Sequence, residues 1–308
     1  MENKTFTLEF HILPFFFKTD NKLFMLSSVF FFLIYLIGML MNIVIIAVIC
    51  LNLHLHTPMY LFLLNLSIID MCYTTVTIPK LLYILLSGNN TVSFTECYIQ
   101  MYFFFIADSA EVTVIFIMAY DRYIAICYPL DYHRILHKKI CILLIVVIWI
   151  CGCVNSSLLT SSILKLFFCS TVTIHQFFCD AKALINISCS GTEVFYIILY
   201  TDCFIFGLWP VLCNLMSYMK IIKVIIGIKS KIGRSKAFST CSSHLTIMVI
   251  YYGSCTSVYL IPASDHYNLL EQVLTVFYTT VVPMLNPLIY SLRNKEVKSS
   301  LRKLILTS

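Results

Sequence analysis

The 308-residue chain is 60% hydrophobic and only 12% charged, whereas a soluble domain has about 25% charged residues. A water-soluble fold of this length could not bury so much apolar surface, so the excess must face lipid. Only helices and closed barrels satisfy every backbone polar group inside a bilayer. The apolar stretches here are continuous rather than alternating, which indicates helices.

Seven apolar stretches are long enough to cross a bilayer, for which about 20 residues suffice. Their approximate limits are 23–50, 59–86, 97–126, 140–163, 194–226, 237–262 and 269–292. We therefore predict an all-α membrane protein built as a seven-transmembrane helix bundle. The expected divisions are an N-terminal tail at 1–22, the helical domain at 23–292 and a C-terminal segment at 293–308.

The C-terminal segment has its own helical pattern. Val297, Leu301, Leu304 and Ile305 recur at i, i+4, i+7 and i+8, with basic residues between them. This spacing predicts a short eighth helix that is amphipathic and lies in the membrane interface.

The basic residues favour an orientation with the amino terminus outside. In that orientation the inner side receives 15 of the 21 Lys and Arg residues, as the positive-inside rule requires. The net charge of +6 then reflects a collar that faces anionic lipid and a protein partner. Nothing in this pattern supports nucleic-acid binding.

The same orientation exposes an N-glycosylation acceptor and four cysteines to the outer, oxidising side. The acceptor is Asn3, in the sequence Asn3-Lys4-Thr5. The cysteines are Cys97, Cys169, Cys179 and Cys189. Four cysteines allow three pairings, among which spacing alone does not choose.

Longer motifs stand at the ends of the predicted helices. They begin with His56-Thr57-Pro58-Met59-Tyr60 in the second stretch and Met118-Ala119-Tyr120-Asp121-Arg122-Tyr123-Ile124-Ala125-Ile126-Cys127 in the third. Ser217-Tyr218, Lys236-Ala237-Phe238-Ser239-Thr240-Cys241-Ser242-Ser243-His244-Leu245 and Pro283-Met284-Leu285-Asn286-Pro287-Leu288-Ile289-Tyr290 follow. This set resembles the odorant (olfactory) receptor family of rhodopsin-like G-protein-coupled receptors, and within it the larger class II.

The resemblance implies a plasma-membrane receptor that binds small volatile odorants and activates a stimulatory heterotrimeric G protein, which raises cyclic AMP. It also implies two disulfides, one between Cys97 and Cys179 and one between Cys169 and Cys189. Together these would order the 164–193 loop across the mouth of the bundle.

The resemblance implies a switch at the inner end. Arg122 would be restrained by Asp121 at rest and released when the sixth helix moves outward, with Tyr123, Tyr218 and Tyr290 contributing to the G-protein socket. Taken alone, Arg122 could be a snorkelling anchor. Pro287 interrupts the last helix, and Asn286 and Tyr290 share one face of it, so we interpret this segment as a hinge.

Asp70 and Glu111 are acids at mid-membrane depth, where bare carboxylates are costly. The resemblance suggests a sodium site formed by Asn42, Asp70, Glu111 and Asn286. A neutral hydrogen-bonded cluster that joins helices is an equally good interpretation. No other cofactor is expected.

Binding sites in helical bundles lie between the helices, below the mouth. At about 1.5 Å per residue, Asp108 lies roughly 21 Å from Arg122, and Asp202 lies roughly 24 Å from Tyr218. We predict a ligand site at this level, formed by Phe104, Phe105, Asp108, Ser109, Asp202, Phe206, Cys255, Tyr259, Thr275 and Thr279.

Asp108 stands where the family often has a small residue, and two interpretations follow. The ligand could carry a positive charge, as a volatile amine does, because an acid among aromatic rings suits an ammonium group. Alternatively, Asp108 could stay protonated or pair with a neighbouring Ser or Tyr and only shape the site. We favour the second interpretation on the sequence alone.

Other functional classes fit less well. A transporter or channel would show an internal repeat or a path of charges, and the enzyme motifs for serine, metal or phosphate chemistry are missing from the sequence. We therefore expect no enzymatic activity. The nearest alternative is a non-olfactory rhodopsin-like receptor for small amines or peptides, against which the motifs at 118–127 and 236–245 argue.

Overall fold

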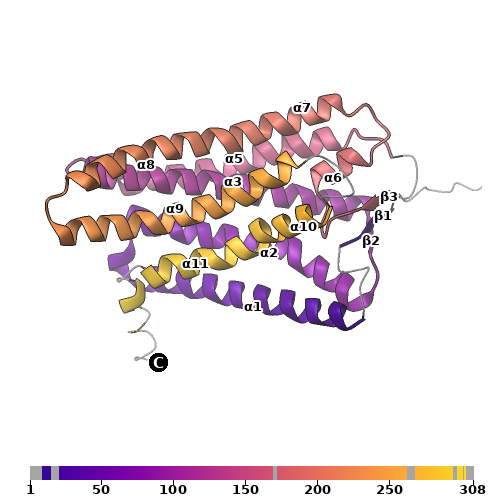
Figure 1. The fold of residues 1–308 in the computed structure, drawn as a ribbon, viewed down its shortest axis with the longest axis horizontal. Coiled ribbons are helices and arrows are strands. Elements are labelled where there is room, and N and C mark those ends of the chain that lie inside the picture. Colours follow the sequence, from indigo (N-terminus) through magenta and orange to yellow (C-terminus); the bar gives the residue numbers. More distant parts are fainter. Residues whose placement is uncertain are drawn as a thin grey trace, which may run out of the picture.

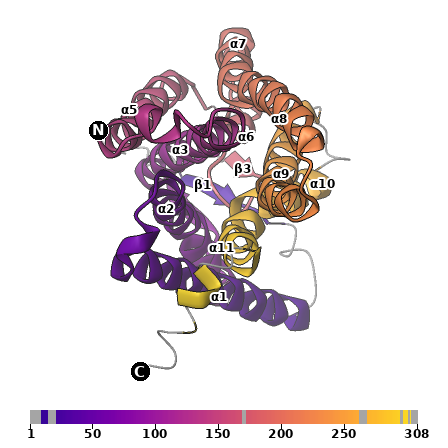
Figure 2. The same cartoon turned by 90° about the vertical axis from the view of Figure 1, so that its left-hand side faces the viewer.

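The computed structural model describes residues 9–14, 21–168, 172–261, 268–293, 297–300 and 302. Long helices run side by side in an elongated bundle (Figure 1). Viewed along the bundle, they form a ring (Figure 2). The apolar stretches take this form because lipid offers no hydrogen bonds to the backbone, and each helix supplies its own.

Six of the described helical segments are long and apolar enough to cross a membrane. They are α1 (Asn21–Leu51), α2 (Pro58–Ser87), α3 (Phe94–Cys127), α5 (Lys138–Ile163), the run of α7 (Glu193–Asp202), η3 (Cys203–Leu208) and α8 (Trp209–Gly227), and the run of α10 (Asn268–Val276), η5 (Phe277–Val281) and α11 (Val282–Arg293). The seventh predicted stretch falls within α9 (Lys231–Leu260), which packs against α8, α10 and α11. Its basic and Ser-rich first half makes α9 less apolar than the others.

Three short helices lie in the connections: η2 (Leu53–Leu55), α4 (Tyr132–Ile135) and α6 (Ala181–Asn186). Beyond α11, residues 297–300 are helical, with Val297 buried and Lys298 exposed. The remaining residues of the predicted amphipathic helix, including Leu301, Leu304 and Ile305, lie outside the described part of the chain. That helix therefore stays a prediction beyond residue 300.

A small sheet that the sequence did not predict closes one end of the bundle. Its strands are β1 (Glu9–Ile12), β2 (Thr91–Ser93) and β3 (Val172–Ile174), in the order β2-β1-β3. β1 is antiparallel to β2 and parallel to β3. Phe10 is fully buried and packs against the rings of Phe94 and Phe168. Part of the N-terminal tail is thus a structural element of the bundle mouth.

α3 runs through the centre of the bundle and contacts α2, α5 and α8. Its first turn is a capping box, in which the Glu96 backbone N–H donates to Ser93 Oγ and the Ser93 N–H donates to Glu96 Oε2. This start places Cys97 beside the sheet and Arg122 near the other end of α3. We call these two ends of the bundle the disulfide end and the Arg122 end.

Two helices contain a wider π-helical turn in mid-course. These turns are η3 and η5, and each ends two residues before a proline, Pro210 and Pro283 respectively. Proline has no N–H for the normal helical hydrogen bond, so a wider turn just before it relieves the helix. Such turns are frequent at functional sites, and these two carry or adjoin residues of the predicted ligand site.

Gly152 of α5 packs directly against the backbone of α3 at Ile106. A Cβ atom at this position would stand 2.9 Å from the Ile106 carbonyl oxygen. Gly152→Ala should therefore force the helices apart and lower the free energy of unfolding by about 1–3 kcal/mol, measurable as a lower thermal midpoint of the purified protein. Gly253→Ala is the control, because no atom lies within 4 Å of a Cβ there. Equal midpoints for the two variants would contradict this packing.

Candidate functional site

A disulfide attaches the 164–193 loop to the start of α3. Cys97 and Cys179 are bonded, with their Cα atoms 5.4 Å apart. The backbone N–H of Cys179 also donates to Gln100 Oε1 at 3.0 Å, and Gln100 Nε2 donates to the Val76 carbonyl at 2.9 Å. Cys189 is disulfide-bonded as well, but its expected partner Cys169 lies outside the described residues. The loop is therefore fixed over the helices as a lid.

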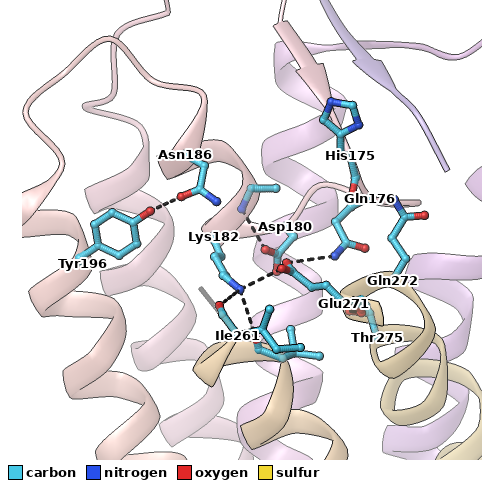
Figure 3. Close-up of polar contacts among 12 residues, drawn as sticks. His175, Gln176, Asp180, Lys182, Asn186, Tyr196, Ile261, Glu271, Gln272 and Thr275 are labelled. Carbon is cyan, nitrogen blue, oxygen red and sulfur yellow. Dashed lines mark hydrogen bonds and ion pairs between the residues drawn. The ribbon is translucent and has the colours of Figure 1, made fainter. Parts of the chain in front are cut away.

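A buried ion pair fastens the same lid to α9 and α10 (Figure 3). Lys182 Nζ lies 3.0 Å from Glu271 Oε2 and also donates to the carbonyls of Val258 and Ile261 at 2.8 and 2.9 Å. All three ammonium hydrogens are thus used. Gln176 Nε2 contacts the other Glu271 oxygen at 3.3 Å. With both charges satisfied, the pair can remain out of water.

Asp180 sits beside this pair and caps the short helix α6. Its Oδ2 accepts from the Ala183 N–H at 3.1 Å, and its side chain is buried. Burial, together with the nearby Glu271 carboxylate, raises the pKa of Asp180 from 3.8 to about 6. The sequence alone indicates no role for Asp180, Lys182 or Glu271, because Lys182 and Glu271 are 89 positions apart.

Asp108 lies deeper, where α2, α3 and α9 meet. Its Oδ1 accepts from the hydroxyls of Tyr73 at 3.0 Å and Tyr251 at 2.9 Å. Pairing with Tyr was one of the two interpretations of Asp108. Asp108 is half-buried, and both of these donors reach the same oxygen.

The ten predicted ligand residues divide into two groups. The first is almost fully buried and consists of Phe104, Phe105, Ser109, Thr275 and Thr279. The second keeps partial accessibility and consists of Asp108, Asp202, Phe206, Cys255 and Tyr259. The first group therefore packs in the interior of the bundle, whereas each member of the second group keeps some accessible surface.

Asp202 closes α7 directly before the π-helical turn η3. The Asn155 amide contacts both Asp202 and Ser109, the latter at 2.9 Å. Within the described residues, the Oδ1 atom of Asp202 is buried without a hydrogen-bond donor. This places a second acid, with unused acceptor capacity, in the same half of the bundle as Asp108.

An apolar groove of about 330 Å³ lies apart from these residues, on the outside of the bundle between α3 and α5. Phe94, Tyr98, Thr160 and Leu164 contribute to its lining. None of the predicted ligand residues lines it, so it is distinct from the candidate ligand site.

Three of the four residues predicted for a sodium site meet in the middle of the bundle. Asn286 Nδ2 donates to Asp70 Oδ1 at 2.9 Å and lies 3.5 Å from Glu111 Oε1. The fourth, Asn42, donates instead to the carbonyls of Gly38 and Pro283. One oxygen of each of these four side chains is buried without a donor among the described residues. Two are carboxyl oxygens and two are amide oxygens, the ligand types that a small hard cation prefers.

At the Arg122 end, Arg122 Nε lies 3.7 Å from Asp121 Oδ2. Asp121 is buried, and its Oδ1 accepts from the Tyr132 hydroxyl at 2.8 Å. Burial raises the pKa of Tyr132, and the Asp121 carboxylate raises it further, so Tyr132 stays a donor. Tyr132 of α4 therefore shares Asp121 with Arg122, a role that sequence reasoning did not identify.

His244 connects three helices at the same end. Its Nε2 lies 3.1 Å from the Ile115 carbonyl, which can only accept, and its Nδ1 lies 2.7 Å from the Tyr218 hydroxyl. A neutral ring must therefore donate through Nε2 and accept from Tyr218. His244 belongs to the motif at 236–245. The fold shows in addition that its ring connects α9 to α3 and α8.

The structure gives fewer contacts for the other predicted switch residues. Tyr123 stacks edge-on with Tyr128, and Pro287 lies inside α11 as expected. The side chain of Tyr290 and the glycosylation candidate Asn3 lie outside the described residues.

The pKa of Asp180 gives a test of the lid. The folded chain binds the Asp180 proton more tightly than the unfolded chain, so the stability from this group is lost as the pH rises through about 6. The wild type should be more stable at pH 5.5 than at pH 7.5 by about 1 kcal/mol from this group. Asp180→Asn keeps the cap and should lose this difference in thermal midpoint. An identical pH dependence in both proteins would refute the assignment.

Comparison with known proteins agrees with this architecture. A family model described as Olfactory receptor matches residues 31–308. Olfactory receptor 8A1 of Homo sapiens is 46% identical over 273 residues, which cover 88% of this chain and 82% of the relative. Olfactory receptor 8D1 of Homo sapiens is 44% identical over 273 residues, 89% of each chain. Olfactory receptor-like protein OLF4 of Canis lupus familiaris is 41% identical over 301 residues, 98% of this chain and 97% of the relative. Because these matches span nearly the whole chain, it belongs to the olfactory receptor family.

Proposed function

We propose that this chain binds small volatile odorants at the disulfide end of the bundle and activates a stimulatory heterotrimeric G protein, which raises cyclic AMP. Family membership identifies a receptor rather than an enzyme. The observation that carries the ligand proposal is the half-buried carboxyl group of Asp108 at the disulfide end, where one of its oxygens accepts from Tyr73 of α2 and Tyr251 of α9. Binding sites of helical bundles have this position and this mixture of apolar walls with few polar groups.

Six long apolar helices and the family assignment identify a multi-pass protein of the plasma membrane. We propose that the disulfide end faces outward and the Arg122 end faces the cytoplasm. The distribution of Lys and Arg supports this orientation, and so does the disulfide, because disulfides persist on the oxidising side.

A ligand at the disulfide end can act on the Arg122 end by binding one arrangement of the helices better than another. α3 joins the two sites, since it carries Asp108 in one half and Arg122 in the other. We propose that outward movement of α9 breaks the contacts of His244 with Ile115 and Tyr218, and that Arg122 is then free to contact the G protein.

A test of coupling follows from the position of Arg122. Arg122→Gln removes the guanidinium, so cyclic AMP should fall to the level of cells without receptor, in the basal state and with odorant. Surface display, measured by antibody to an epitope tag, should persist. Lys165→Gln removes one positive charge from an exposed position at the disulfide end and should signal normally. Normal signalling by Arg122→Gln would contradict the proposed role.

We propose a sodium ion as the ligand of the central cluster, held by Asp70, Glu111, Asn286 and Asn42. The free oxygens of these side chains support the proposal, and a cation would offset the repulsion between two carboxylates in lipid-enclosed surroundings.

Sodium binding should appear as stabilisation that potassium does not reproduce at equal ionic strength. At ten times its dissociation constant, sodium would add about 1.4 kcal/mol, measured as a higher thermal midpoint. Asp70→Asn should abolish this sodium-specific shift. Equal midpoints in sodium and potassium for the wild type would instead favour the neutral hydrogen-bonded cluster.

A further inference from the structure

We propose that the preferred ligand of this receptor is a small protonated amine, whose ammonium group binds the free side of Asp108. The inference rests on the proposed odorant-binding function and narrows it to one chemical class. On the sequence alone, pairing of Asp108 with tyrosines and binding of an amine were alternatives. The structure makes them compatible.

The described hydrogen bonds to Asp108 occupy one side of its carboxyl group. Both tyrosine hydroxyls donate to the same oxygen, Oδ1. The residue is only half-buried. Tyr73 and Tyr251 therefore orient the carboxylate and stabilise its charge, while its other side remains open to a donor from a ligand.

A second acid lies in the same half of the bundle. Asp108 is on α3 and Asp202 is at the end of α7, and the Asn155 amide contacts Asp202 and donates to Ser109, the neighbour of Asp108 in the chain. Asp202 has a buried oxygen without a donor in the described part of the chain. In such low-dielectric surroundings an added positive charge would be favourable.

The described lysines of this half are engaged or distant. Lys182 is committed to Glu271 and two carbonyls. Lys80 pairs with Glu96, and Lys165 is exposed. Within the described part of the chain, Asp108 thus has two tyrosine partners and no cationic one. A ligand with an ammonium group would supply the cation that stabilises a buried carboxylate.

Aromatic side chains lie around Asp108. Tyr73 packs against Phe104 with ring centroids 5.1 Å apart, and Phe104 packs against Phe178 of the lid at 4.6 Å. Tyr251 and Tyr259 approach from α9. Aromatic faces attract a desolvated ammonium group and also accept the apolar remainder of a volatile amine. A carboxylate-bearing odorant would be repelled from the same site.

The test compares amines with alcohols of the same carbon skeleton in cells that express the receptor, the stimulatory G protein and a cyclic-AMP reporter. Surface display is measured in parallel. Wild-type receptor should respond to amines at concentrations at least about tenfold lower than to the matched alcohols, one tenfold step being a modest ionic contribution. This comparison needs no variant, so it stands even if a substitution impairs folding.

Asp108→Asn keeps the size of the side chain and removes its charge. The potency of amines should fall by about 100-fold, as expected when one partner of a buried ion pair is removed, and the preference over alcohols should disappear. Glu193→Gln is the matched control, because Glu193 is an exposed acid at the start of α7. Its amine responses should equal those of the wild type.

Alcohols as potent as amines on the wild type, or an unchanged amine preference in Asp108→Asn, would overturn the proposal. Silence toward both classes, from a displayed receptor whose basal cyclic AMP depends on Arg122, would also overturn it and would leave the proposed coupling intact. Absence of basal signal and of any response to a broad neutral panel would instead count against the proposed function itself.

Discussion

The disulfide between Cys97 and Cys179 is the constraint on which the organisation of the disulfide end depends. It fixes the middle of a long loop to the first turn of α3, and closing a loop in this way removes many conformations from the unfolded chain. The neighbours of Cys179 acquire fixed positions as a result. Phe178 rests on Phe104, and Lys182 reaches Glu271 across the bundle mouth. The strand β3 can then pair with β1 from the N-terminal tail, so three distant segments form one lid.

Burying a charged group inside the bundle is energetically unfavourable, and the buried ionisable groups are compensated in different ways. Lys182 and Glu271 neutralise one another, and backbone carbonyls use the remaining ammonium hydrogens. Asp121 is shared by Arg122 and Tyr132. Asp70 and Glu111 converge on Asn286 and still retain free oxygens. The ion-paired groups hold parts of the structure together, and Asp70 and Glu111 are the groups for which a cation is proposed.

α3 runs the length of the bundle and contributes a group to each of several polar sites. From one end to the other it contributes Cys97, Asp108, Glu111, the Ile115 carbonyl and Asp121. α9 contacts it at two of these positions, through Tyr251 at Asp108 and through His244 at the Ile115 carbonyl. A single helix, α9, thus forms both contacts. The two π-helical turns, η3 and η5, lie in the helices that flank α9.

The amino-acid sequence by itself determined the class of fold, the approximate positions of the long helices, and the resemblance to the family. Those features depend on local composition and on contiguous motifs, because a segment of about 20 apolar residues must span lipid as a helix wherever it packs. The sequence also identified Asp70, Glu111, Asp108 and Arg122 as candidate functional residues, because ionisable residues are rare in membrane helices.

The sequence did not reveal the partners of these residues. Four features join positions far apart in the chain. They are the pairing of Lys182 with Glu271, the hydrogen bonds of two tyrosines to Asp108, the contacts of His244 with two other helices, and the strand formed by residues 9–12. Only the tertiary structure decided them, because such contacts depend on how the helices are rotated and how deeply each one sits.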